Sequence, residues 1–124
     1  MTKPAILLID DEEVIRDVIS RLLERNGYRV FTAEESEAGL KLLKEEPIDL
    51  ILLDLMLPGR SGLECLEEIF DIAPDVSVVM ISAYASIENA VKATKMGAFD
   101  FVTKPFKNEE LLNVIKNGLA LRSL

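Results

Sequence analysis

The chain has 124 residues, 49% of them hydrophobic, which is typical of one folded domain with a single core. Aspartate and glutamate outnumber lysine and arginine by 22 to 14, and this net charge of −8 argues against nucleic-acid binding by the chain. The single cysteine, Cys65, excludes an internal disulfide, and the N-terminal apolar run AILLI is too short for a signal peptide or a membrane span. We therefore expect a cytoplasmic protein without membrane contact.

The first third of the chain alternates between strand and helix patterns. AILLI (5–9) is continuously apolar, as strands buried on both faces of a parallel sheet are. A helix follows, ended by Asn26-Gly27, with apolar residues at helical spacing: Val14, Ile15, Val18, Ile19, Leu22 and Leu23. YRVFTA (28–33) alternates like an edge strand, and a second helix runs from about Glu35 to Glu45 and ends before Pro47.

The middle of the chain repeats the pattern. DLILLD (49–54) and VSVVMIS (76–82) are again almost continuously apolar, which predicts two more central strands. The helix between them ends before Pro74 and carries Leu63, Leu66, Ile69 and Phe70.

The last third predicts two helices around a short strand. Ser86 can cap the first of these helices and Gly97 can end it, with a predicted inner face of Ile87, Ala90, Val91 and Thr94. FDFVTK (99–104) is short and mixed, like an edge strand. Asn108 can cap the final helix, whose predicted inward residues are Leu111, Leu112, Ile115 and Leu119.

Five strand–helix units predict an α/β fold, a flavodoxin-like (βα)5 doubly wound parallel sheet. The first, third and fourth strands look central and the other two look like edges, which gives the strand order 2-1-3-4-5. We treat residues 1–124 as one domain. The last helix, about 108–124, ends in apolar residues, which suggests a linker to an output domain outside this sequence.

Acidic residues follow two strands that this order makes neighbours. Asp10 and Asp11 come after the first strand and Asp54 ends the third, at the switch point where such sheets bind ligands. Strands lie about 5 Å apart, so paired charges there repel by about 3 kcal/mol at an effective dielectric near 20. Such a cluster needs a cation, and an all-oxygen site suits Mg²⁺. Taken alone, the acidic pair also fits residues that cap the next helix.

Two further strand ends extend the pattern. Ser82 closes the fourth strand with a hydroxyl, and Lys104 closes the fifth with a positive charge. Acids, hydroxyl and ammonium at one edge suit phosphoryl transfer to a carboxylate, with Asp54 as the nucleophile. A cap, a snorkelling lysine and a strand-end acid would explain each residue singly, but not why all of them fall at carboxyl ends.

At these residues the sequence resembles the receiver domain of two-component response regulators. The motifs are IDDE, LILLDLMLPGRSGLE, MISAYA and GAFDFVTKPF, and the resemblance covers essentially the whole chain. GAFDFVTKPF is most similar to receivers of the nitrogen-regulator type, which precede an ATPase domain in enhancer-binding transcription activators.

The resemblance implies a phosphoacceptor and a metal site. Asp54 would accept the phosphoryl group and would also bind Mg²⁺. Asp11 would bind the ion directly and Asp10 partly through water, joined by the backbone carbonyl of Met56.

The resemblance also implies a switch. Lys104 would contact the phosphoryl group, and Ser82, in place of the more frequent threonine, would move to hydrogen-bond it. Phe101 stands where the family keeps its aromatic switch, and the Lys104-Pro105 peptide bond is expected to be cis.

The function implied is that of a phosphoacceptor switch in a two-component phosphorelay that regulates transcription. The domain would catalyse only its own phosphorylation, from a sensor kinase phosphohistidine, and its slow dephosphorylation. The chain has no histidine and so cannot be that donor. The face formed by the fourth helix, fifth strand and fifth helix would then form a phosphorylation-dependent dimer or contact the output domain.

Two alternatives stay open. A haloacid-dehalogenase-type phosphatase also phosphorylates an aspartate at a strand end, but it needs a second aspartate two positions later, where this chain has Met56. A receiver-like interaction module could signal without phosphate, although the intact set of acids and lysine argues against it.

Overall fold

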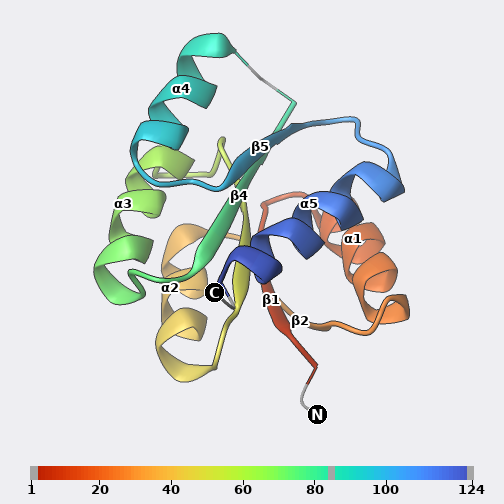
Figure 1. Cartoon of the computed structure of the whole chain (residues 1–124). Helices are drawn as coiled ribbons and strands as arrows, with labels where there is room; N and C mark the ends of the chain where they lie inside the picture. Colours follow the sequence, from red (N-terminus) through yellow and green to blue (C-terminus); the bar gives the residue numbers. More distant parts are fainter. Residues whose placement is uncertain (1–2, 84–85, 123–124) are drawn as a thin grey trace.

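Strands and helices alternate along the chain, as the sequence predicts (Figure 1). The computed structural model describes residues 3–83 and 86–122. In this part of the chain the strands are β1 (Ala5–Ile9), β2 (Arg29–Ala33), β3 (Leu50–Asp54), β4 (Ser77–Ser82) and β5 (Asp100–Thr103). The helices are α1 (Glu13–Arg25), α2 (Ser36–Glu45), α3 (Gly62–Ile72), α4 (Ile87–Lys95) and α5 (Asn108–Arg122). None of the helices described is long and apolar enough to cross a membrane.

The five strands form one parallel sheet in the order β2-β1-β3-β4-β5, which confirms the predicted fold and strand order. Because β2 lies on one side of β1 and β3 on the other, the winding direction reverses between β1 and β3. The carboxyl ends of all five strands therefore meet at one edge of the sheet, with the switch point between β1 and β3.

The sheet has a core on each face (Figure 1). On one face Ile51 and Met80 pack under α2, α3 and α4, and on the other Leu52 and Ile81 pack under α1 and α5. Every residue of β1, β3 and β4 is buried. These continuous apolar runs arise because successive side chains point to opposite faces, and here both faces are covered.

The predicted helix ends are largely confirmed. Gly27 ends α1 and Gly97 ends α4, and both have positive φ angles that favour glycine. The Ser86 hydroxyl accepts a hydrogen bond from the Asn89 N–H at 3.0 Å, which caps α4. Asn108 differs from the prediction by one position, because it is the first residue of α5 itself.

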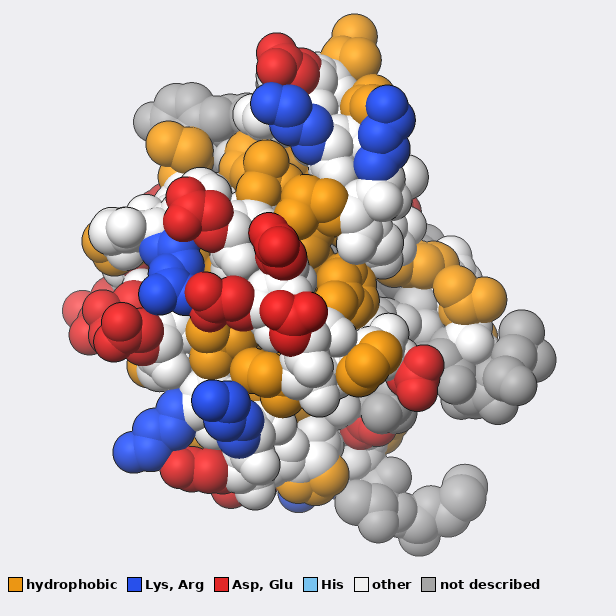
Figure 2. Space-filling view, turned by 90° about the vertical axis from the view of Figure 1, so that its left-hand side faces the viewer, with side chains coloured by type: hydrophobic (Ala, Val, Ile, Leu, Met, Phe, Trp, Pro, Cys, Tyr) orange, Lys and Arg blue, Asp and Glu red, His pale blue; other side chains and the backbone are white. Residues whose placement is uncertain are grey.

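The predicted inner face of α4 is wrong. Ile87 is 86% exposed and Val91 44% exposed, whereas Ala93 is the buried residue of this helix. The helix lies against α3 and β5, where the small Ala93 fits, and its bulkier apolar residues turn to the outside. Figure 2 views the molecule from the side of α2, α3 and α4, where hydrophobic side chains remain exposed among charged ones. In α1, similarly, Ile19 and Leu23 are buried while Val14 and Val18 are exposed.

Candidate functional site

The carboxyl edge of the sheet brings together side chains from distant parts of the chain. Asp10 and Asp11 follow β1, Asp54 is the last residue of β3, Ser82 is the last of β4, and Lys104 follows β5 directly. The lysine is 94 residues away from Asp10 in sequence, yet the two side chains are in contact. The sheet order alone accounts for this, because it places β1, β3, β4 and β5 side by side.

Four carboxylates lie at this edge. Asp10, Asp11, Glu12 and Asp54 each offer an oxygen, and these oxygens lie within 4.8 Å of one another. Asp10 and Asp54 are buried, at 0% and 4% exposure, whereas Asp11 and Glu12 are exposed. The sequence reasoning did not single out Glu12. Its only signal was the unbroken acidic run after β1, which does not reveal that the side chain faces the site.

Lys104 is the counter-charge of the cluster. Its Nζ lies 2.7 Å from Asp10 Oδ2, 3.5 Å from Asp54 Oδ2 and 3.6 Å from Glu12 Oε1. Burial acts to lower the pKa of Lys104, but the hydrogen bond to Asp10 and the neighbouring carboxylate charges raise it above its ordinary value. The lysine is therefore a stable cation. With four ionised carboxylates against one ammonium, three negative charges remain unbalanced.

Asp54 has an unusual carboxyl group. Burial raises its pKa to about 6, and the charge of Asp10 raises it further, while the Met56 N–H and Lys104 act in the opposite direction. The Met56 N–H donates to Oδ1 at 3.1 Å, and the other oxygen, Oδ2, faces Lys104. At neutral pH the group is therefore mainly a carboxylate, held by one backbone hydrogen bond, with its second oxygen beside a cation.

Ser82 and Phe101 lie toward the other face of the sheet. Strand alternation places Ser82 on the same side as Met80, and Phe101 packs against the core under α2, α3 and α4. Ser82 is buried, and its backbone carbonyl accepts a hydrogen bond from the Lys104 N–H at 2.8 Å. The Lys104-Pro105 peptide bond is cis, as expected. The sheet thus connects the serine, the lysine and the half-buried aromatic ring.

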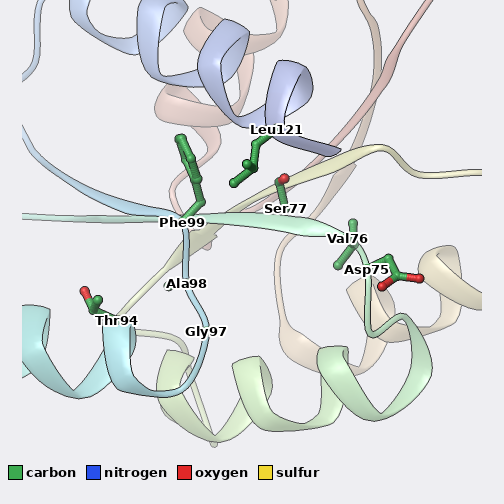
Figure 3. Close-up of a pocket in the computed structure, with 8 residues that line it drawn as sticks. All are labelled: Asp75, Val76, Ser77, Thr94, Gly97, Ala98, Phe99 and Leu121. Carbon is green, nitrogen blue, oxygen red and sulfur yellow. The ribbon is translucent and has the colours of Figure 1, made fainter. Parts of the chain in front are cut away.

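A hollow of about 820 Å³ lies at the opposite edge of the sheet, where β4 and β5 begin (Figure 3). Its lining is largely apolar, with Val76, Phe99 and Leu121, and the Ser77 hydroxyl is engaged because it donates to the Gly118 carbonyl at 2.8 Å. Figure 3 shows Thr94 and Asp75 at opposite ends of this lining. This hollow lacks the converging charged groups of the carboxyl edge, so we place the candidate site at the carboxyl edge.

Residues 6–116 match the response regulator receiver domain family. The chain is 39% identical over 121 residues to a putative NtrX-like response regulator of Rickettsia bellii, covering 96% of this chain and 25% of that protein. It superposes on the structure of a CheY-like receiver domain protein from Methanospirillum hungatei with a TM-score of 0.94 and 34% identity, covering 98% and 97% of the two chains. A Burkholderia pseudomallei response regulator, solved with a phosphorylated aspartic acid and a calcium ion, gives a TM-score of 0.87 and 35% identity, covering 98% and 72%.

Proposed function

The chain belongs to the family of response regulator receiver domains, and from this premise we propose that Asp54 accepts a phosphoryl group from a phosphohistidine of a sensor histidine kinase. The curated relatives named as regulators of transcription include proteins from Escherichia coli and Pseudomonas aeruginosa. The chain spans about a quarter of the length of these relatives. The action of a whole protein, including control of transcription, is therefore part of the proposal.

The observation that carries the proposal is the buried Asp54 carboxylate, whose Oδ2 lies 3.5 Å from the Lys104 ammonium. In the proposed step an Asp54 oxygen forms a bond to phosphorus while the bond from phosphorus to the kinase imidazole nitrogen breaks. The imidazole keeps the electron pair of that bond and takes up a proton. Lys104 balances the negative charge on the phosphoryl oxygens. Attack of water on phosphorus later releases inorganic phosphate and restores the carboxylate.

The acidic cluster fits a divalent cation. All its donors are oxygens, and its unbalanced negative charge favours cation binding, as Mg²⁺ sites require. We propose that Asp10, Asp11, Asp54 and the Met56 carbonyl hold Mg²⁺, with Glu12 at the rim. When bound, the ion would neutralise charge on the phosphoryl oxygens. Both carboxylate oxygens of Asp10 already accept hydrogen bonds, from the Glu12 N–H and from Lys104, which favours a partly water-mediated role for Asp10.

We propose that phosphorylation changes the face formed by α4, β5 and α5. Ser82 and Phe101 lie toward the side of the sheet that α4 covers, so an inward movement of Ser82 would leave room there for the ring of Phe101. The same face carries the exposed Ile87 and Val91, apolar residues that a partner could cover. The proposed partners are a second copy of the domain, or an ATPase or DNA-binding output domain that follows this chain. We place this signalling in the cytoplasm, on the grounds of composition.

The two alternatives meet different tests. Met56 offers no acid-base group for the phosphatase alternative, and the family assignment favours a receiver. A phosphate-independent module predicts no phosphorylation at all. We therefore test the proposed function by incubating the protein with acetyl phosphate or a phosphorylated kinase and measuring its intact mass.

One added phosphoryl group is expected, only with Mg²⁺ present. Asp54→Asn should abolish the addition, and Asp75→Asn, which alters an exposed aspartate outside the cluster, should not. Labelling that persists in Asp54→Asn would refute the assignment of the phosphoacceptor.

A further inference from the structure

Arg16 contacts the site from behind. It lies in the first turns of α1, and its side chain is only 18% exposed. Its Nη1 donates a hydrogen bond to the backbone carbonyl of Asp10 at 2.7 Å, and its Nη2 lies 3.8 Å from Glu34 Oε2, in the loop after β2. A guanidinium can reach both oxygens because its N–H donors form a rigid planar fork. Arg16 thus joins the loop that carries the acids to the neighbouring loop.

The carbonyl that Arg16 holds belongs to the peptide group between Asp10 and Asp11. The orientation of this group determines the directions in which the two neighbouring side chains leave the backbone. Asp10 is fully buried, so water cannot readily replace the lost hydrogen bond, and a buried carbonyl without a donor is costly. Without Arg16 we therefore expect the peptide group to turn toward another donor and to take Asp10 and Asp11 with it.

The other contacts of Asp10 leave this role to Arg16. The Asp10 N–H donates to the Ala33 carbonyl at 3.0 Å, Oδ1 accepts from the Glu12 N–H at 2.9 Å, and Oδ2 accepts from Lys104. Each of these contacts holds either the amide or the side chain, whereas Arg16 holds the carbonyl. Arg16 also brings a positive charge to the acidic cluster without taking up a carboxylate oxygen of Asp10, so it does not compete with a cation for that ligand.

We propose that Arg16 is a positioning residue of the site: it holds the peptide group between Asp10 and Asp11, and so sets the relative positions of two carboxylates that bind the divalent cation. This inference rests on the proposed function, because it assumes that the cluster binds Mg²⁺. Loss of an outer partner that orients metal ligands typically weakens metal binding by about 10- to 100-fold. We therefore expect Arg16→Met to weaken Mg²⁺ binding by about tenfold or more.

The test compares three variants with the wild type, by titration with MgCl₂ in calorimetry and by backbone amide NMR of the metal-free proteins. Arg16→Met removes the donors and keeps an unbranched side chain. Arg16→Lys keeps the charge but not the fork, and should bind Mg²⁺ with an affinity between those of the wild type and Arg16→Met. Arg21→Met is the matched control, because Arg21 lies on the same helix, is 68% exposed and pairs with Asp17 instead. The Asp11 amide shares its peptide group with the Asp10 carbonyl, so its resonance should move in Arg16→Met and stay in Arg21→Met.

The outcomes separate the two levels of inference. If the wild type does not bind Mg²⁺, the metal site of the proposed function is wrong and the role of Arg16 falls with it. If the wild type binds Mg²⁺ and folded Arg16→Met binds it equally well, only the positioning role is refuted, even where the variant melts earlier. Equal weakening by Arg21→Met would mean that net charge alone acts, which also refutes it. If Arg16→Met does not fold, wild-type affinity in Arg16→Lys refutes the proposal.

Discussion

Replacing Asp54 by asparagine should stabilise the protein in the absence of divalent cations. The Asp54 carboxylate is buried beside Asp10, and its pKa is raised from 3.8 to about 6, with burial as the main cause. A raised carboxyl pKa means that the folded state binds the proton more tightly than the unfolded state does. Folding with this group ionised is therefore unfavourable at neutral pH. Asparagine has the same shape, and its amide oxygen can still accept the Met56 N–H.

The size of the effect follows from the shift. Two pKa units at 1.36 kcal/mol each amount to about 3 kcal/mol in the free energy of unfolding at pH 8. The substitution also removes the 3.5 Å contact between Asp54 and Lys104, although Lys104 keeps its 2.7 Å contact with Asp10. We therefore expect a net gain of about 1–3 kcal/mol, or roughly 5–10 °C in melting temperature for a domain of this size.

The dependence on pH gives the sharper test. The stability associated with Asp54 is fully present below about pH 4 and is lost as pH rises through about 6, so the wild type should lose stability across this window. The advantage of Asp54→Asn should be largest at pH 8 and should shrink toward pH 4. Urea unfolding in EDTA at several pH values measures it. Glu67→Gln, an exposed position on α3, controls for the change in net charge. A variant no more stable than the wild type at pH 8, or a gain independent of pH, would refute the reasoning.

Three further predictions follow from the site and its surroundings. Mg²⁺ at ten times its dissociation constant should stabilise the wild type by about 1.4 kcal/mol in thermal unfolding, and Asp11→Asn should lose most of this gain; equal stabilisation of both proteins would contradict the metal site. Ile87→Ala should change the free energy of unfolding by less than about 0.5 kcal/mol, because Ile87 is 86% exposed, whereas Ala93→Leu should cost about 1–3 kcal/mol by overpacking the buried side of α4; the reverse order in urea unfolding would restore the inner face predicted from sequence. Binding of beryllofluoride, a phosphoryl mimic, should shift backbone amide NMR signals across residues 82–115 as well as beside Asp54, and shifts confined to the loops after β1 and β3 would mean that the site does not drive the switch.

Much of the fold could be read from local patterns. The continuous apolar runs of β1, β3 and β4 predicted central strands, because a strand covered on both faces needs apolar residues at every position. Once the strand order followed from these runs, the residues at the carboxyl ends had to meet. The proximity of Asp10, Asp54 and Lys104 was therefore predictable without coordinates.

Only the tertiary structure decided the orientation of α4 and the finer geometry of the site. Helical spacing in α4 allowed two faces, and the space against α3 and β5 selected the small Ala93 over the larger Ile87. The roles of Glu12 and Arg16 depend on side chains that reach Lys104 and the Asp10 carbonyl, contacts that no periodicity encodes. The raised pKa of Asp54 depends on burial and on the nearby charge of Asp10. Sequence pattern reports what each element buries along its own axis, whereas packing and electrostatics depend on which elements become neighbours in space.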